Sequence, residues 1–76
     1  MDGLEQLYTL YRVHIRELLG EEWADWFAPM HIIRPERGGT LLMGNIKDKA
    51  QLYGLLILLR DLNLTLLSVE SEDVPL

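Results

Sequence analysis

One segment in the second half of the chain follows a helical repeat closely enough to limit the folds open to the protein. Its large apolar residues recur at the i, i+3, i+4, i+7 spacing of one buried stripe, and they are Leu52, Leu55, Leu56, Leu59 and Leu62. Asp48 stands where a helix N-cap is expected, and Gln51 follows three residues later to complete a capping box. Asn63 stands where a helix commonly ends in the left-handed conformation. The pattern predicts a helix over residues 48–62 whose leucines belong to the structural core.

Strand-like segments lie on both sides of this helix. Residues 30–34, "MHIIR", and residues 40–46, "TLLMGNI", flank "PERGG", whose two glycines can supply the positive φ of a tight return, so they predict a hairpin. Gly44 inside the second strand predicts a bulge or a close backbone approach. Residues 64–70, "LTLLSVE", alternate like a strand, and both of its faces carry large apolar groups, so we expect both faces to be covered.

The N-terminal third fits two periodicities. As a strand, residues 7–18 place one set of side chains on each face: Tyr11, Val13 and Ile15 on one, and Arg12, His14 and Arg16 on the other. As a helix that stops at Gly20, the same region presents a stripe made of Leu4, Leu7, Tyr8, Tyr11, Ile15 and Leu18. The β-branched Val13 and Ile15 favour the strand, and residues 1–10 stay open between strand and helix.

Two long stretches resemble a known family. They are "YRVHIRELLGEEWADWFAPMHI" and "GGTLLMGNIKDKAQLYGLLILLRDLNLTLLSV", within Tyr11 to Val69. The chain is similar there to small, uncharacterised prokaryotic proteins that carry a W-x-x-W-F block, a G-G-T-x-L-x-G segment and a D-x-A-x-L-x-G-L-L…R-D-L-x-L-x-L-L-S-V ending. The resemblance implies a strand at Tyr11 to Leu18 and implies no activity. Relatives tend to have polar residues at Ile57 and Leu58 and glycine at Asn63, so the outer helix face need not be simply solvated.

The resulting order of elements is strand, short helix, strand, strand, helix, strand. This is the βαββαβ order of the ferredoxin-like α+β fold, with a four-stranded antiparallel sheet, a short first helix and one long helix. Right-handed crossovers would place both helices on one face of the sheet and the first strand in its interior. We expect a single domain over residues 1–76, with residues 1–8 as an N-terminal extension and residues 71–76 as a frayed tail.

The largest apolar side chains gather in one acidic stretch, "GEEWADWFAPM", residues 20–30. The aromatic residues are Trp23, Trp26 and Phe27, and the acidic ones are Glu21, Glu22 and Asp25. A first helix this short must cover the sheet with few, large side chains, so we predict that the three aromatic residues share one face and close the core. A binding site is the alternative, and the acidic flanks disfavour a membrane wedge.

A basic row would line the sheet face opposite the helices. Arg12, His14 and Arg16 share that face in the strand interpretation and are the candidates for an anion or ligand site, because arginine binds carboxylates and phosphates in a bidentate manner. The simpler interpretation is a solvated face, or ion pairs across a dimer. Binding of single-stranded RNA would need an aromatic platform that the row lacks.

The sequence excludes several kinds of chemical site. Without cysteine there is no disulfide or thiolate metal site, and His14 and His31 have no short ligand spacing, so we expect no metal and no cofactor. No nucleophile elbow, P-loop or zincin pattern occurs, and "PERGGT" lacks the lysine and helix start of a phosphate loop. We assign no catalytic residue and do not expect an enzyme.

The charge balance limits the classes of binding partner that we expect. A formal net charge of −5 at pH 7 argues against nucleic acid and anionic membranes. The longest apolar run, residues 55–59, is too short to span a membrane, and the N-terminal residues do not have the pattern of a secretory signal. We expect a cytoplasmic protein with no membrane partner.

A chain of 76 residues without disulfides builds a marginal core, and pairing with a second copy is the remaining way to bury more surface. We therefore expect a homo-oligomer, most simply a homodimer. One candidate contact is the outer side of the helix, with Tyr53, Gly54, Ile57 and Leu58. The other is the open face of the sheet, with Leu64 and Leu66 of the last strand, and it is slightly favoured because it hides more area.

Three hypotheses about function follow. The leading one is an interaction or structural module that acts by binding and self-association, with an unidentified protein as a further partner. The alternative is a regulatory domain that holds a small ligand or anion at a subunit interface. The third is a binder of single-stranded nucleic acid. None of the three needs a catalytic residue.

Overall fold

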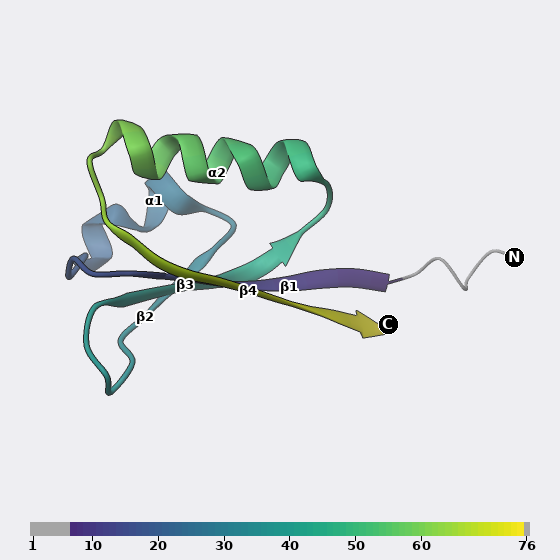
Figure 1. Cartoon of the computed structure of the whole chain (residues 1–76), viewed down its shortest axis with the longest axis horizontal. Coiled ribbons are helices and arrows are strands. Elements are labelled where there is room, and N and C mark those ends of the chain that lie inside the picture. The colour runs from purple at the N-terminus through teal and green to yellow at the C-terminus, as the bar shows by residue number, and fades with distance from the viewer. Residues whose placement is uncertain (1–6, 76) are drawn as a thin grey trace, which may run out of the picture.

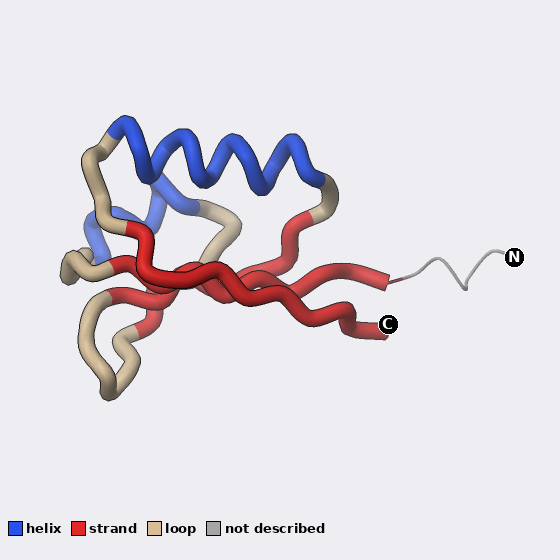
Figure 2. Tube along the Cα trace, viewed as in Figure 1, coloured by secondary structure: helices blue, strands red, loops and turns tan. Residues whose placement is uncertain are grey.

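A four-stranded sheet forms one layer of the molecule and the helices form the other (Figure 1, Figure 2). A computed structural model describes residues 7–75, with the side chains of residues 9–74. The elements in chain order are β1 (Leu7–Ile15), the 3₁₀ helix η2 (Glu21–Trp23), α1 (Ala24–Phe27), β2 (His31–Ile33), β3 (Thr40–Ile46), α2 (Lys49–Asp61) and β4 (Leu66–Pro75).

The strand order across the sheet is β2-β3-β1-β4, and every neighbouring pair is antiparallel. β1 therefore lies in the interior of the sheet, as the sequence predicted. Both α1 and α2 lie on the same side of the sheet, which leaves its other face without a helix (Figure 1). The prediction of an α+β chain with a four-stranded antiparallel sheet and two helices is confirmed.

The N-terminal third forms a strand, but earlier than predicted. β1 starts at Leu7 instead of residue 11, so residues 7 and 8 belong to the sheet rather than to an extension. It pairs with β3 on one side and β4 on the other, and these two ladders satisfy backbone groups that a helix would have satisfied internally. In the alternative helical stripe, Leu4 falls outside the described residues and Leu18 lies in the loop after β1 with 68% of its surface exposed.

The last strand is longer than predicted and begins later. β4 starts at Leu66 instead of Leu64 and continues to Pro75. The prediction that residues 71–76 fray is therefore wrong for residues 71–75, and residue 76 lies outside the described part of the chain.

Side-chain contacts with β1 help to hold this acidic end of β4. The Thr9 hydroxyl donates to the Asp73 carboxylate at 3.1 Å, and Arg12 forms an ion pair with Glu72 at 3.1 Å. Sequence composition alone suggested a solvated tail, because these partners lie some 60 residues away along the chain.

The long helix begins and ends as predicted. Asp48 Oδ1 accepts from the Gln51 backbone N–H at 2.9 Å, and Gln51 Oε1 accepts from the Lys47 N–H at 2.8 Å, one residue earlier than in a standard capping box. Asn63 has a φ of 61°. The N–H groups of Asn63 and Leu64 donate to carbonyls of the last helical turn, which is the Schellman ending.

The hairpin between β2 and β3 also follows the prediction. β3 has the predicted bounds, and β2 is shorter than the predicted strand. Gly38 and Gly39 have φ values of 94° and 75° in the turn, a region that favours glycine. At Gly44 a Cβ atom would lie 2.9 Å from the sulfur of Met30, so the close backbone approach is confirmed.

The core lies between the sheet and the helices. Its buried residues are Val13, Ile15, Leu19, Phe27, Met30, Leu42, Ile46 and Leu59. Of the predicted leucine stripe, only Leu59 is fully buried, while the other four leucines pack against the core and stay partly exposed. α1 has only four residues, so it leaves most of the flank of α2 uncovered.

Candidate binding surfaces

The aromatic stretch divides between the core and the surface. Phe27 is 2% exposed, Trp23 is half-buried against the core, and Trp26 is 58% exposed. The prediction that all three belong to the core is therefore wrong for Trp26. Neighbouring residues on a helix point about 100° apart, and a helix of four residues that aims Phe27 at the sheet turns Trp26 away from it. Trp26 instead packs against Trp23, with 5.7 Å between ring centroids.

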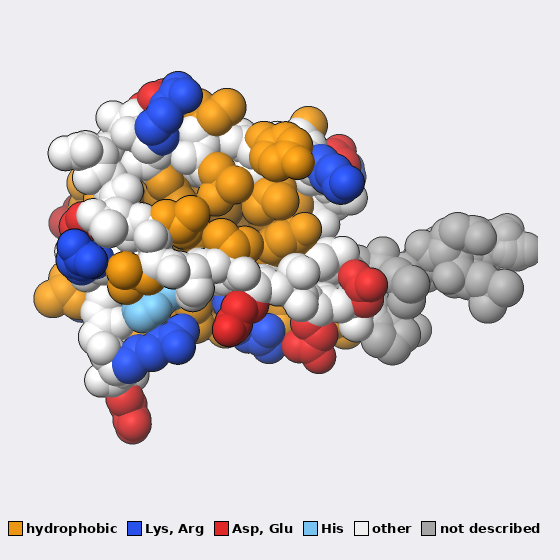
Figure 3. Space-filling model, in the orientation of Figure 1, with side chains coloured by type: hydrophobic (Ala, Val, Ile, Leu, Met, Phe, Trp, Pro, Cys, Tyr) orange, Lys and Arg blue, Asp and Glu red, His pale blue; other side chains and the backbone are white. Residues whose placement is uncertain are grey.

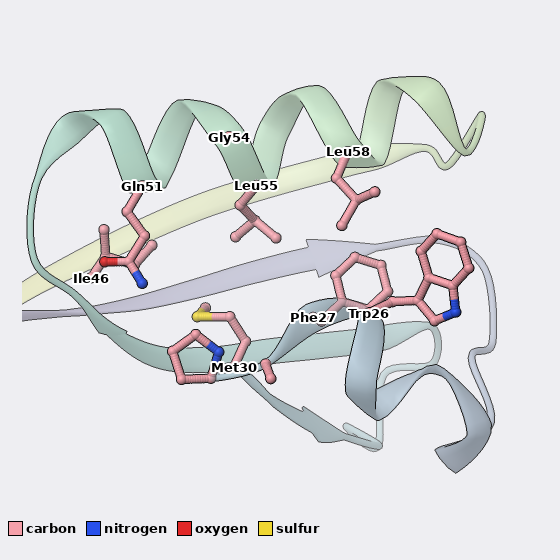
Figure 4. Close-up of a pocket in the computed structure, with 10 residues that line it drawn as sticks. Trp26, Phe27, Met30, Ile46, Gln51, Gly54, Leu55 and Leu58 are labelled. Atoms are coloured by element: carbon pink, nitrogen blue, oxygen red, sulfur yellow. The ribbon is translucent and has the colours of Figure 1, made fainter.

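A groove runs between α1 and α2, which we call the interhelix groove, and it contains a cavity of about 200 Å³ (Figure 4). Its main lining residues are Trp26, Pro29, Met30, Ile46, Gly54 and Leu58. Figure 4 shows Trp26 and Phe27 directed from α1 towards the side of α2 that carries Leu58. The side chains that line it are apolar except for that of Gln51.

Two of the residues predicted for self-association lie in this groove. Leu58 and Gly54 both line it, and a Cβ atom at Gly54 would meet no atom within 4 Å. Tyr53 and Ile57 do not line it, and they are 55% and 48% exposed. The helix therefore presents two different flanks, where the sequence suggested one.

The acidic residues of this stretch, Glu21, Glu22 and Asp25, are all exposed. Asp25 is the direct chain neighbour of Trp26, whereas the Glu22 carboxylate lies beside Gly20. The last turn of α2, which carries Leu58, passes above Trp26 in Figure 4, and the C-terminal end of a helix dipole is negative. This end of the groove is therefore favourable for a cation.

Exposed hydrophobic residues gather on the other flank of α2 and on β4. The large exposed ones are Tyr53, Ile57, Leu66, Leu67 and Val69, and we call this set the β4 edge surface. β4 is an outer strand of the sheet and has a strand neighbour on one side only. Figure 3 shows hydrophobic side chains gathered in the band between α2 and β4.

The structure changes the placement of Leu64 and Leu66, which the sequence assigned to the open face of the sheet. Leu66 lies opposite Ile15, a core residue on the helix side, and it borders a hollow of about 290 Å³ together with Leu56 and Leu59 of α2. Leu64 precedes β4 and packs partly buried against the core. Leu66 thus lies beside α2 on the helix-covered side of the sheet and not on its open face.

The predicted basic row lies along β1 but is largely engaged by the protein itself. Arg12 pairs with Glu72, as described above. His14 is 7% exposed, and its Nε2 donates to the carbonyl oxygen of Gly38 at 2.8 Å. Arg16 lies beyond the end of β1 and is exposed. Arg12, His14 and Arg16 therefore do not form an exposed cluster of three cations.

The open face of the sheet is mixed in character. Leu10, Ile33 and Met43 border a hollow of about 650 Å³ there, beside His31 and Lys47. Among the side chains of residues 9–74, no tyrosine, tryptophan or phenylalanine lies on this face, since Tyr11 packs against the core and the others are on helices. The aromatic platform that single-stranded RNA would need is therefore missing from this part of the chain.

Two further features concern metals and membranes. Within residues 7–75, no group of three or more histidine, aspartate or glutamate residues is arranged to hold a metal ion. Across the same part of the chain, no helix combines the length and the apolar character needed to cross a bilayer.

The layers and surfaces described above define a small α+β domain with one helix-covered sheet face and apolar grooves on both flanks of its long helix. The chain belongs to the family described as a domain of unknown function, DUF8691, which matches residues 10–70. The similarity to an uncharacterised family is thereby confirmed. No curated protein and no solved structure matches the chain.

Proposed function

We propose that the protein is a non-catalytic interaction module that self-associates as a homodimer through the β4 edge surface. The observation that carries this proposal is the position of the exposed hydrophobic residues. Five of them lie on the outer flank of α2 and on the free outer strand, at 40–55% exposure. An apolar patch on a small monomer marks an interaction site, and an uncovered edge strand is a ready template for pairing with another strand.

The fold supports the same proposal. We assign the chain to the ferredoxin-like arrangement, with η2 and α1 together as its short first helix, because the order β2-β3-β1-β4 and the two helices on one side fit it. In this arrangement β4 lies at one edge, next to α2. A second copy that adds its own β4 would extend the sheet and bring the two α2 flanks together.

Charge is compatible with antiparallel pairing of the two edge strands. The first half of β4 is apolar, and its second half carries Glu70, Glu72 and Asp73. Antiparallel pairing centred on the apolar half places the two acidic halves at opposite ends of the contact. Like charges are thereby separated.

Sedimentation equilibrium of matched lysine variants tests this proposal. Leu67→Lys places a charge within the β4 edge surface, and Leu18→Lys makes the same change at a residue that is exposed outside it. We expect dimers from the wild type and from Leu18→Lys, and monomers from Leu67→Lys, because the buried charge would lack a partner. A wild type that stays monomeric at millimolar concentration contradicts self-association. Loss of the dimer with Met43→Lys alone would move the contact to the open sheet face.

A further inference from the structure

The interhelix groove lies on the side of α2 that faces α1, and its lining residues differ from those of the β4 edge surface. We propose that it is a docking site for a basic amphipathic segment of another protein, which places one apolar side chain in the cavity and a lysine or arginine against Trp26. This proposal does not depend on the self-association proposed above, because it uses different residues.

The size and lining of the cavity select the apolar part of the partner. A cavity of about 200 Å³ is smaller than the pockets that hold drug-sized ligands, which begin at about 300 Å³. One or two side chains fill such a space. Met30, Ile46 and Leu58 offer them only apolar contacts. An apolar side chain in a peptide segment is therefore the fitting occupant, in the way that amphipathic segments anchor in hydrophobic grooves.

Trp26 selects the charged part of the partner. Its ring is 58% exposed at the edge of the cavity. Tryptophan is the best aromatic partner for a cation, and the exposed Asp25 is its direct chain neighbour. The C-terminal end of α2 adds its negative dipole at the same end of the groove. The one arginine at that helix end, Arg60, is already paired with Asp61 at 3.0 Å.

The charge of this sequence argues against a second copy or one of its own terminal segments as the occupant. Residues 1–6 and 70–76 contain aspartate and glutamate but no lysine or arginine. The whole sequence carries a formal net charge of −5 at pH 7. Such segments would be repelled by the net negative charge of the protein and by Asp25 beside Trp26, whereas a basic segment of another protein would be attracted.

Gly54 gives a variant that closes the groove without loss of folding. Gly54 lines the groove and nothing lies within 4 Å of the position of its Cβ atom, so a leucine there has room at the groove without displacing another group. Leucine is also a better helix former than glycine inside a helix. Gly54→Leu should therefore fold at least as well as the wild type while it blocks the site.

The experiment is a titration of the labelled protein, followed by NMR, with an amphipathic peptide made of leucine and lysine. A peptide in which every lysine is replaced by glutamate serves as the charge control. We expect the lysine peptide to shift the Trp26 indole signal and the signals of α2 residues that line the groove. We expect Gly54→Leu and Trp26→Ala each to weaken its binding by roughly tenfold or more. Tyr53→Ala, a comparably exposed aromatic residue on the other flank, should leave binding unchanged.

Three outcomes would overturn the proposal. Equal binding of the glutamate peptide would show that the positive charge of the partner does not contribute to binding. Undiminished binding to Gly54→Leu would place the peptide outside the groove. Conversion of Gly54→Leu to a different oligomeric state would show that the groove is a contact between copies of this chain. Melting curves of each variant confirm that a loss of binding is not a loss of folding.

Discussion

Trp26 and Phe27 are neighbours in the sequence, yet they have opposite surroundings. The sequence indicated that large aromatic residues in a short crossover would close the core, and Phe27 does so at 2% exposure. The spacing of the residues could not show which of two adjacent side chains faces the sheet. That depends on how α1 is rotated about its axis where it follows η2. This rotation is determined by how both helices pack on the strands.

Substitution of these two residues should separate their roles. Phe27→Ala should lower the free energy of unfolding by ~3–5 kcal/mol, because it leaves a cavity in the core. Trp26→Ala should lower it by less than about 1 kcal/mol, because most of that side chain is already in contact with water. Urea denaturation of the two variants measures both values. An equal loss for both would mean that Trp26 supports the fold as the sequence first indicated.

Glu17 is a residue whose role the sequence did not indicate. Its carboxylate accepts hydrogen bonds from the backbone N–H and the hydroxyl of Thr65, both at 2.8 Å, and so ties the loop after β1 to the segment before β4. The hydrogen bond from the Thr65 N–H, and then that from its hydroxyl, lower the pKa of this carboxyl below its usual value of 4.5.

This contact should make stability depend on pH in the acid range. Because the pKa is lower in the folded state than in the unfolded chain, the stabilisation is fully present above about pH 4.5 and is lost as pH falls through the folded-state pKa. The stability difference between the wild type and Glu17→Gln should therefore shrink as the solution is acidified. Thr65→Val removes one of the two donors and should give a smaller difference. Urea titrations between pH 3 and pH 7 provide the measurement, and a constant difference would contradict it.

At the scale of single elements, features that depend on nearby residues were predicted better than strand limits that depend on distant partners. The predictions of both ends of α2 and of the turn between β2 and β3 were correct, because helix caps and turn glycines act on residues close to them in the chain. The limits of β1 and β4 were wrong, because each is set by pairing with a strand far away in the chain. The bounds of these two strands follow from their partners more than from their own sequence pattern.

The end of α2 offers a test of such local chemistry. Asn63 adopts a φ of 61°, a conformation that costs most residues roughly 1–2 kcal/mol. Asn63→Ala should therefore lower the free energy of unfolding by roughly 1 kcal/mol, while Asn63→Gly should leave it unchanged or raise it slightly. Thermal melts of both variants decide this, and an alanine variant as stable as the glycine variant would mean that the helix ends differently.

For the molecule as a whole, the sequence predicted the elements and their order, whereas the binding surfaces appeared only in three dimensions. Tyr53 and Leu66 were assigned to competing contacts, yet the β4 edge places them on the same side of the molecule. Gly54 and Leu58 were grouped with Tyr53, yet they line the interhelix groove and Tyr53 does not. These assignments depend on how α2 is rotated about its own axis above the sheet. The leucine stripe covers a wide arc of the helix, so it defines this rotation only approximately.

The position of α2 between the two surfaces leads to a prediction about their coupling. The interhelix groove uses Gly54 and Leu58, and the β4 edge surface uses Tyr53 and Leu66, so no residue is shared. Two sites influence each other only through an element that has two arrangements, and α2 is one continuous helix capped at both ends. The dimer dissociation constant should therefore change by less than about threefold when the lysine–leucine peptide is present at saturation.

By reciprocity, the monomeric Leu67→Lys variant should bind that peptide with an affinity within about threefold of the affinity of the wild-type dimer. Analytical ultracentrifugation with and without peptide gives the first value and a peptide titration gives the second. A larger change in both would mean that α2 shifts as a unit when either surface is occupied.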